Sequence, residues 1–133
     1  MPDLSMFDMT GKVAILTGSS IGMGRALAEG LALAGAKVVI SSRKEDVCEQ
    51  TATEINEMCG EEVAIAIACN IGYKEQLQNL VDQTHARLGK VDILVCNAGV
   101  NPFYGPSSEI PDSAFDKTLA SNVKSNHWMN LCC

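Results

Sequence analysis

The sequence predicts an α/β fold built on a doubly wound parallel sheet, and three observations support this prediction. Short apolar runs alternate with stretches of helical periodicity along the chain. The runs are apolar on both faces, as strands between two layers of helices are. The first run passes through a glycine-rich turn into a helical stretch. With 133 residues the chain has the length of one domain, and we expect the strand order 3-2-1-4, with a crevice where that order reverses.

The strands are expected wherever a short apolar run is bounded by turn residues. The first ends in the glycine-rich turn, and the second follows its helix directly. The four predicted strands are Val13–Thr17, Lys37–Ser41, Val63–Cys69 and Val91–Cys96. Cys69 and Cys96 would each end a buried strand, where a thiol packs as a small hydrophobic side chain.

Each strand is followed by a stretch in which apolar residues recur at helical spacing, and we expect these residues to face the core. Gly35, Gly60 and Gly89 stand where the first three helices would end. Ser42 and Glu45 have the spacing of a capping box at the start of the second helix. The four predicted core faces are Met23, Leu27, Leu31 and Ala34; Val47, Thr51, Ile55 and Met58; Leu77, Leu80, Val81, Thr84 and Leu88; and Phe115, Leu119, Val123, Asn126 and Met129.

The connection Asn97–Pro111 is rich in Asn, Gly and Pro and is long for a compact domain. Connections of this kind are usually functional loops. The helical pattern that follows it runs to Cys133 without a stop signal, so the chain is expected to end inside an element.

Composition excludes several classes of function. The net charge of −6 and the absence of a Lys/Arg cluster argue against a nucleic-acid or anionic-membrane partner. The first ten residues do not form a signal peptide and no apolar stretch is long enough to span a bilayer, so we expect a cytoplasmic protein with reduced cysteines. No metal site is expected, because His85 and His127 have no ligands at metal-binding spacing.

The turn after the first strand contains Gly18, Gly22 and Gly24. Glycines at the start of a helix let backbone N–H groups approach an anion with no Cβ in the way, so the turn predicts a nucleotide. The alternative is a tight connection from strand to helix with no ligand. The spacing is neither the common G-x-G-x-x-G fingerprint nor a P-loop.

Three motifs together resemble the short-chain dehydrogenase/reductase family. They are Thr17-Gly18-Ser19-Ser20-Ile21-Gly22-Met23-Gly24, Cys96-Asn97-Ala98-Gly99 and Ser121-Asn122-Val123-Lys124. Cys96 departs from the family pattern, which has Asn there, and is expected to point into the packing. The resemblance implies a Rossmann-like dinucleotide-binding domain and hydride transfer between nicotinamide and a carbonyl or alcohol substrate. Outside the motifs, the sequence is similar to the NADP(H)-preferring carbonyl reductase and retinal reductase branch.

The resemblance also implies the site residues, with Asn122 as a catalytic residue. Ser42 stands where NAD-preferring members carry an acid, and Arg43 could bind a 2′-phosphate, so NADP(H) is expected over NAD(H). Ile21 departs from this, because many NADP-binding relatives have a basic residue there. The expected cofactor-binding residues are Gly18, Ser19, Ser20, Ile21, Gly22, Met23, Gly24, Ser42, Arg43, Asn70, Ile71, Asn97, Ala98 and Gly99.

The family's chemistry also needs a Ser and a Tyr-x-x-x-Lys pair. Tyr73 is followed four residues later by Leu77, and Tyr104 by Ser108. We therefore expect residues 1–133 to be the N-terminal part of a single dinucleotide-binding domain, without turnover alone and prone to self-association, with a substrate only in a full-length form. The alternatives are a non-catalytic nucleotide-binding or interaction module and, less favoured by the motifs, another doubly wound nucleotide binder such as a methyltransferase.

Overall fold

The computed structural model describes residues 3–133, and it confirms the predicted doubly wound sheet. All strand pairs are parallel, and Ile15 lies beside Val39 on one side and Leu94 on the other. The strand order is β3-β2-β1-β4, as predicted. The strands are β1 (Val13–Thr17), β2 (Lys37–Ser41), β3 (Ala64–Ala66) and β4 (Ile93–Val95).

Helices follow the strands in alternation. Single turns of 3₁₀ helix occur at η1 (Ser5–Phe7) and η2 (Ser107–Glu109), and a π-helical segment, η3 (Ala120–Lys124), joins the last two helices. The helices are α1 (Gly22–Leu33), α2 (Glu45–Cys59), α3 (Lys74–Leu88), α4 (Asp112–Leu119) and α5 (Ser125–Cys132).

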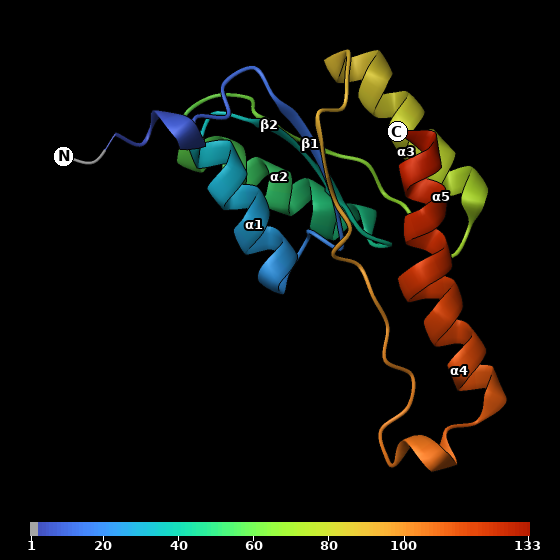
Figure 1. The fold of residues 1–133 in the computed structure, drawn as a ribbon. Coiled ribbons are helices and arrows are strands. Elements are labelled where there is room, and N and C mark those ends of the chain that lie inside the picture. The colour runs from blue at the N-terminus through green and yellow to red at the C-terminus, as the bar shows by residue number, and fades with distance from the viewer. Residues whose placement is uncertain (1–2) are drawn as a thin grey trace.

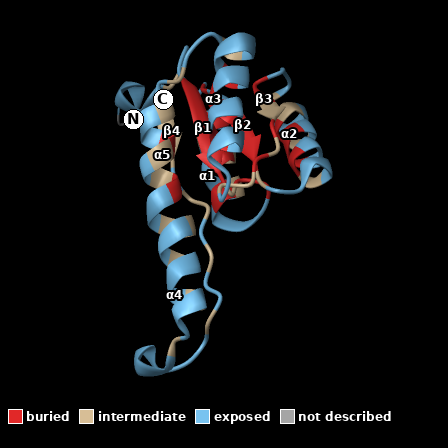
Figure 2. Ribbon diagram, turned by 90° about the vertical axis from the view of Figure 1, so that its right-hand side faces the viewer, coloured by how far each residue is buried: buried red, intermediate tan, exposed pale blue. Residues whose placement is uncertain are grey.

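The pleat of the central strands divides the core into two layers. Ala14 and Leu16 of β1 pack in one cluster with residues of α1 and α2, whereas Ile15 packs in the other with residues of α3 and α5. Figures 1 and 2 show α1 and α2 on one face of the sheet and α3 and α5 on the other. Both faces of β1 are therefore buried, as its continuous apolar sequence predicts.

The core face of α1 differs from the prediction. Gly24, Ala28 and Ala32 are buried, whereas Met23 is 80% exposed and Leu27 is 48% exposed. The buried face is thus one residue further along the chain, because small side chains allow the helix to lie close to the sheet. The prediction followed the large apolar side chains, which recur every four residues, and these lie on the neighbouring face of the same helix.

The other predicted faces vary in accuracy. Leu77, Leu80, Val81 and Thr84 of α3 are buried as predicted, and Gly89 ends that helix in a left-handed conformation. In α2, Thr51 and Ile55 are buried as predicted, but Met58 in the last turn is exposed. Gly60 ends α2 as predicted, with φ +74°.

The two edge strands are shorter than the predicted ranges. Ile67 N–H still donates to the Ile40 carbonyl, and Cys69 N–H donates to the Ser42 carbonyl, so β3 continues as extended chain beside β2. Cys69 is buried, but Cys96 is exposed, and the prediction that Cys96 packs inside is wrong. It follows β4 at an edge of the sheet, where the described residues provide no further strand to cover it.

The C-terminal helical pattern also differs from the prediction. Met129 is buried, but Phe115, Leu119 and Val123 are 50%, 46% and 60% exposed. Figures 1 and 2 show the reason, because α4 and the loop before it project beyond the end of the sheet. No other element in the described part of the chain covers this side of α4.

All six cysteines are free thiols. Burial raises the pKa of Cys69 to about 11, so this thiol stays protonated at neutral pH. No helix between residues 3 and 133 is long and apolar enough to cross a membrane.

Candidate functional site

The glycine turn leaves almost no room for side chains. Gly18 has φ +65°, and a Cβ there would lie 2.9 Å from Ala98 Cα. A Cβ on Gly24 would collide with the Gly18 carbonyl oxygen and would lie 2.6 Å from Asn97 Nδ2. Gly22 has open space, but its φ of +62° favours glycine. Sterics at Gly18 and Gly24 and conformation at Gly22 therefore explain the three glycines.

Thr17 joins this turn to the turn after β4. The N–H groups of Asn97 and Ala98 donate to Thr17 Oγ1 at 3.2 and 3.1 Å, and the Thr17 hydroxyl donates to the Val95 carbonyl at 3.4 Å. Asn97 Nδ2 donates to the Gly18 carbonyl at 3.0 Å. The two turns that the motifs select thus form one hydrogen-bonded unit at the carboxyl ends of adjacent strands. The sequence motif includes Thr17 but gave it no role.

Ser19 joins the glycine turn to β2. Its hydroxyl donates to the Leu16 carbonyl at 2.7 Å and accepts from Ser41 N–H at 2.9 Å, and its own N–H donates to the Ser41 carbonyl. The side chain is fully buried, so Ser19 shapes the turn from inside. In contrast to the buried Ser19, Ile21 and Met23 have exposed side chains at the start of α1.

Ser42 and Arg43 follow the end of β2. The predicted capping box is wrong, because α2 begins at Glu45 with Lys44 as its N-cap and without a side-chain cap. The chain turns later than expected, and Ser42 Oγ lies 3.1 Å from Cys48 Sγ while it accepts from Lys44 N–H at 3.4 Å. Arg43 is exposed, and within residues 3–133 it forms no ion pair.

Asn70 and Ile71 form the turn after β3. Asn70 Oδ1 accepts from Gly72 N–H at 3.0 Å, which is the local turn contact that an Asn side chain makes in an Asx turn. The Ile71 carbonyl accepts from the buried Ser125 hydroxyl at 2.6 Å. This bond ties the β3 side of the site to α5, 54 residues away.

Asn122 lies in the π-helical segment and binds the loop after Gly99. Its Oδ1 accepts from Val100 N–H, and its Nδ2 donates to the Val100 carbonyl, both at 2.8 Å. A Cβ on Gly99 would lie 3.2 Å from the same Oδ1. These bonds give a physical reason for an Asn within a helix and for a small residue at position 99. π-Helical segments are frequent at functional sites.

The structure thus brings together the glycine turn, Asn97, Ala98, Gly99 and Asn122, which are linked by direct contacts. Ser42 and Arg43 adjoin the glycine turn through Ser41, whereas Asn70 and Ile71 connect to the helix of Asn122 through Ser125. The glycine turn, Ser42, Asn70 and Asn97 each follow the carboxyl end of a strand, whereas Asn122 lies in η3 after α4. An anion bound at the carboxyl ends of the strands would meet backbone N–H groups at the start of α1.

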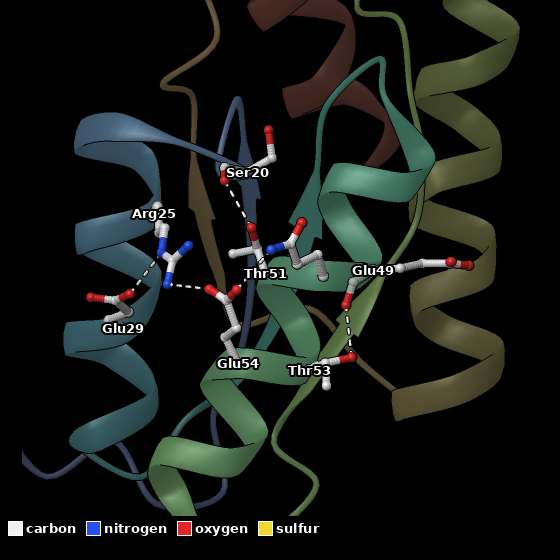
Figure 3. A network of polar contacts seen from close by, with 8 residues as sticks. Ser20, Arg25, Glu29, Glu49, Thr51, Thr53 and Glu54 are labelled. Carbon is white, nitrogen blue, oxygen red and sulfur yellow. Dashed lines mark hydrogen bonds and ion pairs between the residues drawn. The ribbon is translucent and has the colours of Figure 1, made fainter.

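Arg25 is the basic residue nearest to the glycine turn in sequence, but it is bound elsewhere. Its Nε lies 2.8 Å from Glu29 Oε1, and its Nη2 lies 2.6 Å from Glu54 Oε2 (Figure 3). Hydrogen bonds first to Glu29 and then to Glu54 raise the pKa of Arg25. The guanidinium is therefore neutralised locally, whereas Arg43 after β2 forms no ion pair with any described residue.

The structure also has a groove away from these residues. It has a volume of about 820 Å³, and it runs along the outer edge of β3 between α2 and α3. Its lining includes Glu45, Glu49, Glu62 and Arg87, and none of the residues predicted for the site.

Among residues 3–133, no group of three His, Cys, Asp or Glu side chains could hold a metal ion.

Comparison with protein families matches residues 12–131 to the short chain dehydrogenase model. The human protein "Dehydrogenase/reductase SDR family member 2, mitochondrial" is 41% identical over 118 residues, which are 88% of this chain and 41% of that protein. "Tropinone reductase-like 3" of Erythroxylum coca is 40% identical over 116 residues, 87% of this chain and 44% of that protein. The chain therefore spans less than half the length of these relatives.

Solved structures show the same similarity. A short-chain type dehydrogenase/reductase from Mycobacterium marinum superposes with a TM-score of 0.89 at 32% identity, over 99% of this chain and 52% of that one. A metagenomic short-chain oxidoreductase in complex with NADP has a TM-score of 0.84 at 31% identity, over 94% of this chain and 56% of that one.

Proposed function

This chain belongs to the short-chain dehydrogenase family, and we propose that residues 1–133 are the NADP(H)-binding, N-terminal part of a single-domain oxidoreductase of that family. The observation that carries this proposal is the contact between the glycine turn and the Asn97 turn. It leaves no space for side chains at Gly18 and Gly24, and the N-terminus of α1 lies just after the carboxyl end of β1. Such a surface fits a pyrophosphate held by backbone N–H groups.

We propose a preference for NADP(H) over NAD(H). At the end of β2 there is a hydroxyl, Ser42, where a carboxylate would repel a 2′-phosphate, and the exposed Arg43 next to it is free of acidic partners in the described structure. A charge-assisted contact contributes roughly 1.5–3 kcal/mol, which corresponds to about tenfold or more in affinity. One similar solved structure is a complex with NADP, which supports the same assignment.

The substrate group that we propose is a carbonyl or an alcohol, as the names of the similar dehydrogenases and reductases suggest. The nicotinamide, when bound, supplies or accepts the hydride. The residues of this chain would bind and orient the dinucleotide, and Asn122, which holds the loop after Gly99, is the residue that we propose for the catalytic set. We expect no NADPH oxidation by the 133-residue chain with a diketone, because the Ser and the Tyr-x-x-x-Lys pair are not among its residues.

Two further parts of the proposal concern the whole protein. We propose self-association, since apolar side chains of α4 are exposed.

We also propose a reducing compartment, the cytoplasm, because all six cysteines are free thiols. The human relative has the word mitochondrial in its name, so imaging of the tagged protein in cells would test this location.

Titration of the chain with NADPH and with NADH tests the cofactor assignment. We expect NADPH to bind about tenfold more tightly or better. Arg43→Ala should remove most of that difference. Lys37→Ala is the matched control, because it deletes an exposed cation at the opposite end of the same strand and should preserve the preference. Equal or tighter binding of NADH would contradict the preference, and binding of neither would contradict the dinucleotide site.

A further inference from the structure

Helix α2 contacts the glycine turn through one buried hydroxyl. Thr51 Oγ1 donates to the Ser20 carbonyl at 2.8 Å across 31 residues of sequence, and Thr51 is 2% exposed (Figure 3). Ser20 is itself buried. This hydrogen bond lies in a dry environment, where loss of the donor would leave a carbonyl without a partner.

The hydroxyl of Thr51 has a different kind of hydrogen-bond partner from the hydroxyls of the other helical threonines in this chain. Thr53, Thr84 and Thr118 donate to the carbonyl four residues earlier in their own helix, the usual partner of a helical threonine. Figure 3 shows Thr53 bonded in this way to Glu49, whereas Thr51 points out of the helix toward Ser20. The Thr51 hydroxyl therefore joins two elements.

A second contact lies one helical turn further along α2. Glu54 is three residues after Thr51, which places the two side chains on neighbouring parts of one face. Its Oε2 lies 2.6 Å from Arg25 Nη2, and Arg25 follows Gly24 directly. Helix α2 thus holds the turn on its β1 side through Ser20 and on its α1 side through Arg25.

The bond to Ser20 determines the direction of the next N–H group. The peptide bond is trans, so the Ser20 carbonyl and the Ile21 N–H point in opposite directions. Since the carbonyl points to α2, the Ile21 N–H points away from it. None of the hydrogen bonds within residues 3–133 uses the N–H of Ser20 or Ile21 as a donor, and of these two residues Ile21 is exposed.

We propose that Thr51 is a positioning residue for the dinucleotide, which fixes the Ser20–Ile21 peptide so that the Ile21 N–H faces the pyrophosphate. The inference rests on the proposed function of the site. Thr51 itself does not touch the ligand in this scheme. It acts through the backbone of the turn, and the Arg25–Glu54 ion pair keeps α2 in the place from which Thr51 can donate.

The test uses three variants of the full chain and two probes. Thr51→Val keeps the shape and removes the hydroxyl, Thr51→Ser keeps the hydroxyl, and Thr84→Val is the matched control because it removes an equally buried hydroxyl from α3. The probes are NADPH and adenosine 2′-monophosphate, which has the adenine and the 2′-phosphate but no pyrophosphate.

We expect Thr51→Val to weaken NADPH binding about tenfold, the scale of one hydrogen bond to a charged group, and to change adenosine 2′-monophosphate binding by less than about twofold. Thr51→Ser and Thr84→Val should bind both probes like the unmodified chain. If circular dichroism shows that Thr51→Val is unfolded, Thr51→Ala replaces it, since alanine is the best helix former.

Unchanged NADPH binding by Thr51→Val would overturn the inference, as would equal weakening of both probes or a loss in Thr51→Ser as large as in Thr51→Val. These results leave the proposed function intact, because the unmodified chain still binds NADPH. Failure of the unmodified chain to bind NADPH would overturn the proposed function and this inference with it.

Discussion

Gly24 and Gly30 lie in the same helix but in opposite surroundings. A Cβ on Gly24 would collide with the glycine turn and Asn97, whereas a Cβ on Gly30 would meet nothing within 4 Å. Gly24→Ala should therefore destabilise the fold by about 1–3 kcal/mol, as overpacking does, and should weaken NADPH binding by displacing the turn. Gly30→Ala is the control and should stabilise by about 0.5–1 kcal/mol through helix propensity. Thermal unfolding and NADPH titration measure both effects, and a neutral Gly24→Ala would contradict the steric reading of the turn.

The residues of the site differ in how far sequence could predict them. Gly18, Gly22 and Gly24 are visible because a local turn demands them at fixed spacing. The role of Thr51 cannot be predicted from the sequence, because its hydrogen-bond partner is 31 residues away. The helical periodicity of α2 predicts a buried side chain at this position but not a hydroxyl that donates to another element. Contacts between distant residues require the fold, which is why sequence located the turn but not the side chain that holds it.

At the scale of an element, Asp92 fixes the start of β4. Its Oδ2 accepts from Val13 N–H at 2.9 Å and pairs with Lys90 Nζ at 2.9 Å. The hydrogen bond from Lys90 first, and that from Val13 second, lower the pKa of Asp92 from its ordinary value of 3.8. The folded chain thus binds this proton less tightly than the unfolded chain does. The stabilisation is complete above the unfolded pKa and is lost as the pH falls through the lower folded pKa.

Asp92→Asn should therefore lower the unfolding midpoint in urea at pH 7, and the difference from the unmodified chain should shrink below pH values of about 4. Asp82→Asn is the control, because this carboxylate on α3 contacts only the amide of Gln78 among the described side chains. A difference for Asp92→Asn that stays constant from neutral to acidic pH would show that the carboxylate charge does not hold β4.

Asn56 of α2 has a similar role for β3. Its Oδ1 accepts from Val63 and Ala64 N–H groups at 2.8 and 2.7 Å, and its Nδ2 donates to the Ala64 carbonyl at 2.9 Å. An edge strand with uncovered backbone groups is a template for pairing with another chain. Asn56→Ala should cost about 1–3 kcal/mol in unfolding free energy and should increase aggregation measured by light scattering. Glu57→Ala, an exposed neighbour in the same helix, should do neither.

Edge and end effects explain most of the differences between the predicted and observed elements. The central strands β1 and β2 have the predicted bounds, because paired neighbours on both sides make the apolar runs unambiguous. The edge strands β3 and β4 are shorter than their apolar runs, which lack a partner on one side. The buried face of α1 lies one residue from the predicted face, because Gly24 and Ala28 give a weaker hydrophobic signal than Met23 and Leu27. The π-helical segment has no sequence signature of its own.

At the scale of the whole molecule, burial and charge are unevenly distributed. The sheet packs against α1 and α2 on one face and against α3 and α5 on the other, whereas α4 projects from this core and is largely exposed (Figure 2). The net charge of −6 favours separate chains in solution, but it acts over long distances and is screened by salt. Association through α4 would therefore depend on apolar contacts and should increase as salt is added.

Phe115, Leu119 and Val123 recur every four residues, so they share one side of α4 and η3. Since apolar burial is worth about 25 cal/mol per Å², covering such a stripe with a second copy would favour association. We expect the chain to elute above its monomer mass of 14.2 kDa in light-scattering chromatography, and more so at high salt. The double variant Leu119→Lys and Val123→Lys should shift it toward the monomer, because each lysine would be desolvated in the contact. Tyr104→Ser is the control, since that side chain is 93% exposed on the loop and outside the stripe. Association that is unchanged by the lysines, or a monomer for the unmodified chain, would exclude α4 as the contact.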